Sequence, residues 1–188
     1  VKITEDMIQE RPDLKPYKAR ELTVIAWLWA RTVKSPNPAF KGIDVPLTST
    51  FMLLKKKGKE VYVKPIFEQN GYRFTVKIGK PDNSEAALSG TKLARGANFK
   101  CLMSGTPVPS DYVKTEAKSG RMGAKLMAMV AEGDRERIYL DPTPEHESLA
   151  LNAKTDWQPD NEFFKQALGF RIGNYGFSKW SDLFSSRQ

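Results

Sequence analysis

The sequence contains very little cysteine and histidine. Its 188 residues include one cysteine, Cys101, and one histidine, His146. A single cysteine excludes a disulfide bond within the chain, which fits a reducing cytosol. A structural zinc site needs four ligands, mostly thiolate or imidazole groups. We therefore expect a fold that is held together by neither disulfide bonds nor a metal ion.

The sequence also lacks a long apolar segment. No apolar run approaches the roughly 18 residues that a membrane span requires. The first residues, VKITEDM, have neither the apolar core nor the cleavage site of a signal peptide. The length suits one domain, or one domain with a tail. We expect a soluble cytoplasmic protein, and the start at Val1 rather than Met predicts a piece of a longer chain.

Signatures of catalysis and of nucleotide binding are missing as well. Neither a G-x-G-x-x-G segment after a strand nor a Walker loop is present. Asp141-Pro142-Thr143-Pro144 comes near the D/N-P-P-F/Y/W motif with which amino-methyltransferases hold a flipped base, but it lacks the second adjacent proline and the aromatic residue. Cys101 and His146 would form a thiol nucleophile only if the fold brings them together, and a cysteine buried as a small apolar residue is the commoner case. A thiol hydrolase is therefore the last of three functional alternatives.

The positive charge is concentrated in one part of the sequence. The whole chain has a net charge of +8 and a pI near 9.5, which favours a polyanionic partner. Residues 51–80 contain eight Lys and Arg and two Glu, a net charge of +6. A uniformly solvated surface would not concentrate its charge in this way. This block is therefore the first candidate for a binding surface.

Residues 51–80 also have the clearest strand signals. The Lys57-Gly58 pair lies between two apolar runs, and Asn70-Gly71 precedes an alternation of apolar and polar residues from 72 to 78. The pattern predicts a three-stranded meander. Lysines at its first turn and basic residues along its strands would then share one face. The candidate phosphate-binding residues are Lys55, Lys56, Lys57, Lys59, Lys64, Arg73 and Lys77.

A second basic candidate follows in residues 119–125, SGRMGAK. Gly120-x-x-Gly123 around Arg121 resembles a loop with which RNA-binding modules clamp a nucleic-acid backbone. The alternative, which we favour by about two to one, is a turn that requires a positive φ before the next strand. Arg121 joins the candidate phosphate-binding residues with this alternative left open.

The remaining segments predict an α+β fold rich in antiparallel hairpins, with short helices near both ends. Residues 21–33 are interpreted as a buried strand with Ile25, Trp27 and Trp29 on one face and Val24, Ala26 and Leu28 on the other, although a helix stays an alternative. Thr4 and Thr143 are expected to cap two helices, and the first of these would end at Pro12. The other expected elements are a loop at 80–97 with a helical turn at SEAAL, a strand and turn at 98–109, a helical turn at 110–117, and two strands in 124–142 joined at Gly133-Asp134.

Two turn-rich segments, KSPNPAFKGIDVPL (34–47) and NFKCLMSGTPVP (98–109), resemble the knuckles of a zinc ribbon without most of the sulfur. The four positions where cysteines would be expected hold Ser35, Phe40, Cys101 and Ser104. They supply at most one thiolate, so we expect no bound metal. The two turns would instead face each other and be held by packing, to which Phe40 would add apolar contacts. We therefore expect antiparallel hairpins around a degenerate zinc-ribbon-like core.

Blocks along the whole chain resemble one known family. They are RPDLKPY, LTVIAWLWARTVKSPNP, KLARGANFKCLMSGTPV, SGRMGAKLMAMVAEGDR, YLDPTPEHE and NYGFSKWSDLFSSRQ. Together, and in this order, they are similar to the central region of the large prokaryotic adenine-specific DNA methylases described as containing a Zn-ribbon. The resemblance implies a branch of that family in which most zinc cysteines are replaced. It also implies an insert domain, residues 1–157, followed by an aromatic tail, residues 158–188, that leads to the downstream part of the parent enzyme.

The resemblance further implies what the parent enzyme does. Such methylases transfer a methyl group from S-adenosylmethionine to N6 of an adenine that is flipped out of the duplex. None of their catalytic residues maps onto this chain, so we expect S-adenosylmethionine in the parent enzyme and no cofactor in this piece. The implied function is a non-catalytic insert in the prokaryotic cytoplasm that engages DNA through backbone contacts or acts as a scaffold. The alternative is a purely structural or protein-interaction insert that contacts only the remainder of the parent methylase.

Overall fold

The structure is a computed structural model that describes residues 1–153, 156–164 and 172–184. Its α-helices and 3₁₀ helices (η) are α1 (Glu5–Glu10), η1 (Pro12–Tyr17), η2 (Pro38–Phe40), α2 (Ser84–Ser89), α3 (Ser110–Lys118), α4 (Pro144–Leu151), η3 (Ile172–Tyr175) and η4 (Trp180–Leu183). Its strands are β1 (Val24–Lys34), β2 (Asp44–Pro46), β3 (Met52–Leu54), β4 (Val61–Glu68), β5 (Gly71–Ile78), β6 (Phe99–Lys100), β7 (Pro107–Val108), β8 (Gly123–Glu132) and β9 (Arg137–Leu140). The predicted α+β class, with antiparallel strands and short helices, is confirmed.

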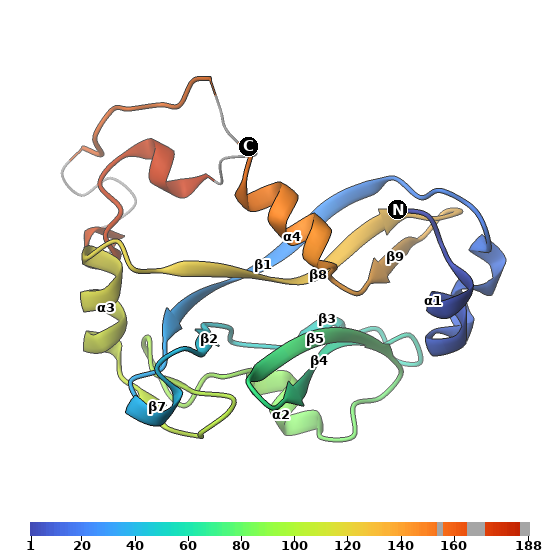
Figure 1. The fold of residues 1–188 in the computed structure, drawn as a ribbon, viewed down its shortest axis with the longest axis horizontal. Coiled ribbons are helices and arrows are strands. Elements are labelled where there is room, and N and C mark those ends of the chain that lie inside the picture. The colour runs from blue at the N-terminus through green and yellow to red at the C-terminus, as the bar shows by residue number, and fades with distance from the viewer. Residues whose placement is uncertain (154–155, 165–171, 185–188) are drawn as a thin grey trace.

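Two antiparallel sheets form the body of the molecule. One has the strand order β2-β1-β8-β9 and the other the order β3-β4-β5, while β6 and β7 pair separately. Figure 1 shows the two larger sheets as layers, with α4 on the outer face of the four-stranded sheet and α2 on the far side of the three-stranded one. The helices α1 and α3 lie at opposite ends of these layers. The molecule therefore has two distinct ends.

The long strand β1 lies where residues 21–33 predicted a strand rather than a helix. Trp27 and Trp29 pack against the same apolar cluster, as the alternation predicts, but Ile25, which was predicted on their face, is 49% exposed and does not pack there. Val24 packs there too, although the prediction placed it on the opposite face. The reason is a β-bulge between Val24 and Ala26, which adds a residue to one strand and shifts the alternation beyond it.

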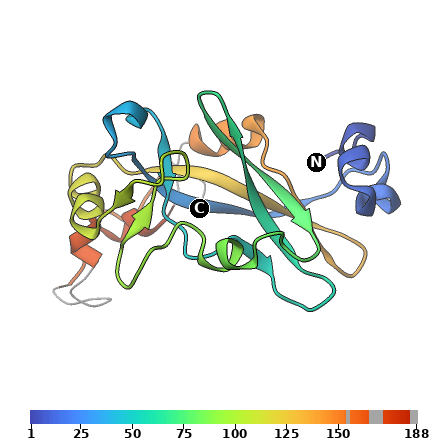
Figure 2. The same cartoon turned by 90° about the horizontal axis from the view of Figure 1, so that it is seen from below.

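The space between the two larger sheets is filled by an apolar cluster. Figure 2 shows β4 and β5 crossing beside β1 and β8 at an angle, and the cluster lies between these two pairs of strands. The ring of Phe74 contacts the rings of Phe51 and Tyr72, with centroids 6.1 and 5.2 Å away. The buried members of the cluster are Ala30, Phe51, Val61, Val63, Tyr72, Phe74, Val76, Met127 and Ala128.

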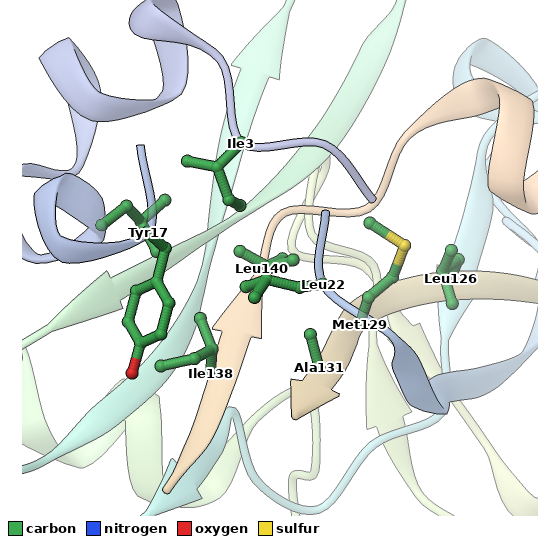
Figure 3. Packing of buried hydrophobic residues seen from close by; sticks show 9 residues of the cluster. Ile3, Tyr17, Leu22, Leu126, Met129, Ala131, Ile138 and Leu140 are labelled. Atoms are coloured by element: carbon green, nitrogen blue, oxygen red, sulfur yellow. The ribbon is translucent and has the colours of Figure 1, made fainter. Parts of the chain in front are cut away.

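The N-terminal segment packs against the other face of the four-stranded sheet. Figure 3 shows side chains of this segment gathered around β9 and the end of β8. Ile3, Tyr17 and Leu22 are nearly inaccessible to solvent there. The buried members of this second cluster are Ile3, Leu14, Tyr17, Leu22, Leu126, Met129, Ala131, Ile138 and Leu140.

Both predicted helix caps are present. The N–H of Met7 donates to Oγ1 of Thr4 at 3.4 Å, and the N–H of His146 donates to Oγ1 of Thr143 at 3.2 Å. The helix α1 ends at Glu10, before Pro12, as predicted. The predicted helical turns are also found, and α3 extends to 9 residues. Among the described residues, no helix has the length and apolar character of a membrane span.

The predicted meander is confirmed as β3-β4-β5. The strands β4 and β5 pair without a break from Val61 to Glu68, and the partner of Glu68 is Gly71. The chain therefore turns at Gln69 and Asn70, one residue earlier than the Asn70-Gly71 signal suggested. The buried residues set this register, because a shift by one residue would turn the apolar side chains of β5 away from the core.

Candidate nucleic-acid interface

Four of the predicted cations lie on the lysine loop, residues 55–60, which joins β3 to β4. All four lysines are exposed. The N–H of Lys59 donates to the carbonyl oxygen of Lys56 at 2.8 Å, and Gly58 has a φ of +78°. A turn with a positive φ at its third residue favours glycine there, so the predicted Lys57-Gly58 turn is confirmed. The turn presents the four ammonium groups to solvent, and no described carboxylate forms an ion pair with them.

Three further cations share one face of β4 and β5. Lys64 pairs with Thr75, which lies between Arg73 and Lys77 on β5. Cross-strand partners and alternate residues of one strand point to the same side of a sheet. The opposite side carries Phe74, which faces the four-stranded sheet. Lys64, Arg73 and Lys77 therefore lie on the side of β4 and β5 opposite to Phe74.

Two of these three cations have carboxylate partners. Nζ of Lys64 lies 2.9 Å from Oδ2 of Asp82, and Nε of Arg73 lies 3.2 Å from Oε1 of Glu68. The hydrogen bond between Lys64 and Asp82 raises the pKa of the lysine and lowers the pKa of the aspartate. Such exposed pairs add little stability. Each pair nevertheless places a negative charge directly beside a cation that was expected to meet phosphate.

Arg121 lies apart from the lysine loop, on the turn between α3 and β8. Its Nε donates to Oε2 of Glu116 at 2.9 Å and its Nη2 donates to Oε1 at 2.6 Å. The hydrogen bond from Arg121 lowers the pKa of the buried Glu116 carboxyl. Gly120 has a φ of +68°, as the turn alternative to a backbone clamp required. In Figure 1 this turn follows α3, at the end of the molecule opposite α1, whereas the lysine loop follows β3 on the α1 side.

Lys80 lies beside the lysine loop, although the sequence predicted that it begins a separate loop, residues 80–97. The N–H of Gly79 donates to the carbonyl oxygen of Glu60 at 2.8 Å, which extends the ladder between β4 and β5. Lys80 is exposed and no described carboxylate pairs with it. Lys80 is recognised as a neighbour of the lysine loop only when the pairing register of β4 and β5 is known. We call the lysine loop together with residues 77–80 the open end of the meander.

The two knuckle-like turns lie side by side, as predicted. Nδ2 of Asn37 donates to Oγ1 of Thr106 at 3.2 Å, and the hydroxyl of Ser104 lies 2.9 Å from the same oxygen. Burial raises the pKa of the Cys101 thiol, but hydrogen bonds with Ser104 and Ser35 outweigh burial and bring the pKa below its ordinary value. Hydrogen bonds as well as packing therefore join the two turns.

The predicted role of Phe40 at these turns is not found. The knuckle cluster consists of Val33, Val45, Phe99, Cys101, Val108 and Val113. Phe40, at the end of η2, is only partly buried and is not among the residues packed against this cluster, whereas Ile43 is. Within the part of the chain that the structure describes, no group of three or more His, Cys, Asp or Glu residues is arranged to hold a metal ion.

The thiol and the imidazole lie in different parts of the molecule. His146 on α4 lies beside Trp27, with ring centroids 6.5 Å apart. Cys101 packs in the cluster of Val33. Trp27 and Val33 are six positions apart on β1, a separation of about 20 Å along an extended strand. The structure therefore gives no support to a thiol hydrolase built on these two residues.

Asp141 has a structural role that the sequence did not indicate. Its carboxylate accepts a hydrogen bond from the N–H of Val76 at 2.6 Å. Nη1 of Arg11 donates to the carbonyl oxygens of Val76 and Tyr139 at 3.4 and 3.2 Å. These side chains join β5 to β9, so they connect the two larger sheets.

The aromatic tail packs partly on its own chain. The Arg31 guanidinium lies 5.4 Å from the ring centroid of Phe177, and the η3 segment lies against α3. A Cβ at Gly176 would come within 2.5 Å of the Ala117 carbonyl oxygen, so glycine permits this close approach. Phe164 of the tail is 79% exposed, and Trp157, just before the tail, is 78% exposed. The predicted boundary between residues 157 and 158 stays a prediction. Residues 165–171 and 185–188 of the tail lie outside the described part of the chain.

Comparison with known proteins gives no match. No family model matches the chain, and no curated protein or solved structure is significantly similar to it. The family resemblance of the sequence blocks therefore stays a prediction.

Proposed function

We propose that this chain is a non-catalytic insert domain of a prokaryotic adenine-specific (N6) DNA methyltransferase, and that it holds the backbone of duplex DNA. The observation that carries the proposal is the lysine loop. Four exposed lysines lie within five residues, and no five-residue window outside this loop contains more than two basic residues. Ammonium groups on a protruding turn neutralise phosphates and position the duplex without reading its bases.

The parent enzyme would supply the chemistry. In this proposal the catalytic parts bind S-adenosylmethionine and flip the adenine, and the insert keeps the flanking duplex in place. The chain lacks the glycine motif and the D/N-P-P-F/Y/W motif that this reaction requires. Its own contribution is therefore binding and orientation, with DNA and the remainder of the methylase as partners in the prokaryotic cytoplasm.

The paired knuckle turns support the family part of the proposal. Ser35 and Ser104 form hydrogen bonds with Cys101 at positions where a zinc ribbon would carry thiolates. We infer a degenerate zinc ribbon in which hydrogen bonds and apolar packing hold together two turns that a metal ion holds in other members. The insert would span residues 1–157, and the tail would lead to the next part of the parent enzyme.

A second candidate function is a scaffold that contacts only protein. The exposed rings of Trp157 and Phe164 favour it, because large aromatic side chains are usually buried at an interface. In this reading the lysine loop is ordinary solvated surface. The two functions differ in whether the lysines affect DNA binding.

The deciding experiment removes the charge of the lysine loop. Lys55, Lys56, Lys57 and Lys59 are replaced together by Ala, and duplex binding is titrated from low to moderate salt, both in this chain and in the parent enzyme. If each lysine contacts one phosphate, the slope of log K against log salt becomes shallower by about 3.6, since each contact contributes about 0.9. The matched control replaces four other exposed lysines that form no ion pair with a described carboxylate, namely Lys2, Lys15, Lys41 and Lys118. Equal slopes for wild type and both variants would support the scaffold and contradict DNA binding.

A further inference from the structure

The predicted cations fall into two groups according to their neighbours. Three of them have a carboxylate partner at 2.9, 3.2 and 2.6 Å, namely Lys64, Arg73 and Arg121. The others, with the additional Lys80, have no carboxylate partner among the described residues. They are Lys55, Lys56, Lys57, Lys59, Lys77 and Lys80.

The lysines of the second group come together at the open end of the meander. The hydrogen bond from Gly79 to Glu60 places Lys77 and Lys80 beside the lysine loop. Arg73 is four positions from Lys77 along β5, about 13 Å away. The open end contains six lysines and one acidic residue, so its net charge is +5. This concentration of charge does not continue along the strands.

We propose that the phosphate-binding site is the open end alone, formed by the lysine loop with Lys77 and Lys80, and that the ion-paired cations lie outside it. The inference rests on the proposed DNA-holding function and specifies which residues perform it. A phosphate that approaches Lys64 or Arg73 must displace a carboxylate from the cation. A phosphate that approaches an unpaired lysine displaces only water and small counterions. The net gain for each phosphate contact is therefore larger at the open end.

The composition of the open end favours the backbone of a duplex as its ligand. Residues 55–60 and 77–80 include no aromatic side chain on which an unpaired base could stack, whereas proteins that bind single strands rely on such stacking. They also include no arginine, whose planar group recognises guanine edges. Lysine acts as a point charge on a flexible stem. The site therefore suits regularly spaced phosphates of any sequence.

The test compares two double variants that remove the same charge. One is Lys77→Ala with Lys80→Ala, and the other is Lys64→Ala with Arg73→Ala. Each is made in the 188-residue chain and titrated with a mixed-sequence duplex at several salt concentrations, after circular dichroism has confirmed the fold. We expect the slope for the first variant to become shallower by about 1.8, from two lost phosphate contacts. The second variant should keep the wild-type slope.

A second comparison adds a cation to the site instead of removing one. Asp82→Asn frees Lys64 from its partner close to the open end, and Asp111→Asn frees Lys114 on α3 by the same change of charge. If ion pairing is what keeps Lys64 out of the site, Asp82→Asn should steepen the slope by up to about 0.9. Asp111→Asn should leave the slope unchanged.

The outcomes separate this inference from the proposed function. If the Lys64 and Arg73 variant changes the slope as strongly as the Lys77 and Lys80 variant, the whole strand face binds DNA. The inference is then wrong, and the proposed function stands. A clear preference for single-stranded over duplex DNA would also contradict the inference. If neither this chain nor the parent enzyme loses affinity when the lysine loop is replaced, the proposed function fails and the inference fails with it.

Discussion

The knuckle turns and the open end of the meander differ in how their polar side chains are paired. At the knuckle turns, Asn37, Ser104 and Thr106 form hydrogen bonds with one another. Among the described residues, no buried side-chain nitrogen or oxygen lacks a hydrogen-bond partner. At the open end the lysines are mostly exposed and have no carboxylate partner in the described chain. Polar groups that are satisfied within a chain stabilise its structure, whereas unpaired charges are available to another molecule.

The largest effect on stability is expected from a residue of the knuckle cluster. Phe99→Ala removes a ring that is 9% exposed, whereas Phe67→Ala removes one that is 57% exposed near the closed turn of the meander. We expect the first change to lower the free energy of unfolding by about 3–5 kcal/mol and the second by less than about 1 kcal/mol. Urea unfolding followed by circular dichroism measures both. Similar losses in the two variants would show that the knuckle cluster is not a structural core.

A smaller effect is expected at the turn of the lysine loop. Gly58→Ala places a side chain at a φ of +78°, which strains an L-residue by about 1–2 kcal/mol. Gly42→Ala is the control, because Gly42 has no positive φ and a Cβ there meets no atom within 4 Å. The net charge of the loop is unchanged, so the salt dependence of DNA binding should match wild type. A shallower slope for Gly58→Ala would mean that the shape of the turn, and not only its charge, determines binding.

The smallest effect on stability is expected from a hydrogen bond to the thiol. Ser104→Ala should lower the free energy of unfolding by about 1 kcal/mol, because it removes bonds to Cys101 and Thr106. It should also raise the pKa of the Cys101 thiol, because burial raises that pKa and the hydrogen bonds with Ser104 oppose it. The ultraviolet absorbance of the thiolate, followed against pH, measures the pKa. Ser119→Ala, at an exposed position after α3, is the control. Identical titrations of wild type and Ser104→Ala would remove the thiol from the hydrogen-bonded network.

Local patterns in the sequence were sufficient for most of the elements. The alternation from Tyr72 to Ile78 predicted the faces of β5, because each residue of a strand points opposite to its neighbours. Thr4 and Thr143 predicted the starts of α1 and α4, since a cap depends only on residues three positions away. The bulge near Val24 was not predictable, because it depends on the pairing of β1 with β8, which lies a hundred positions further along the chain.

The candidate site was predictable in its position but not in its extent. Four adjacent lysines and a Lys-Gly turn located the lysine loop. The partner of Lys64 is Asp82, in a loop beyond the end of the meander, and no local pattern connects them. Lys80 was missed for the same reason, because its place beside the loop follows from the register of β4 and β5. Ion pairs and registers are set by tertiary structure, so they became visible only in the folded chain.

Asp141 and Arg11, the side chains that join the two larger sheets, also cover backbone groups of an edge strand. β5 is an outer strand of its sheet, and exposed backbone groups on such a strand invite pairing with another molecule. The Asp141 carboxylate accepts a hydrogen bond from the N–H of Val76, and the Arg11 guanidinium donates one to the carbonyl oxygen of Val76. One of the two caps comes from the N-terminal segment. A chain without Arg11 would leave that carbonyl without its side-chain donor, so the segment before β1 covers part of this strand edge.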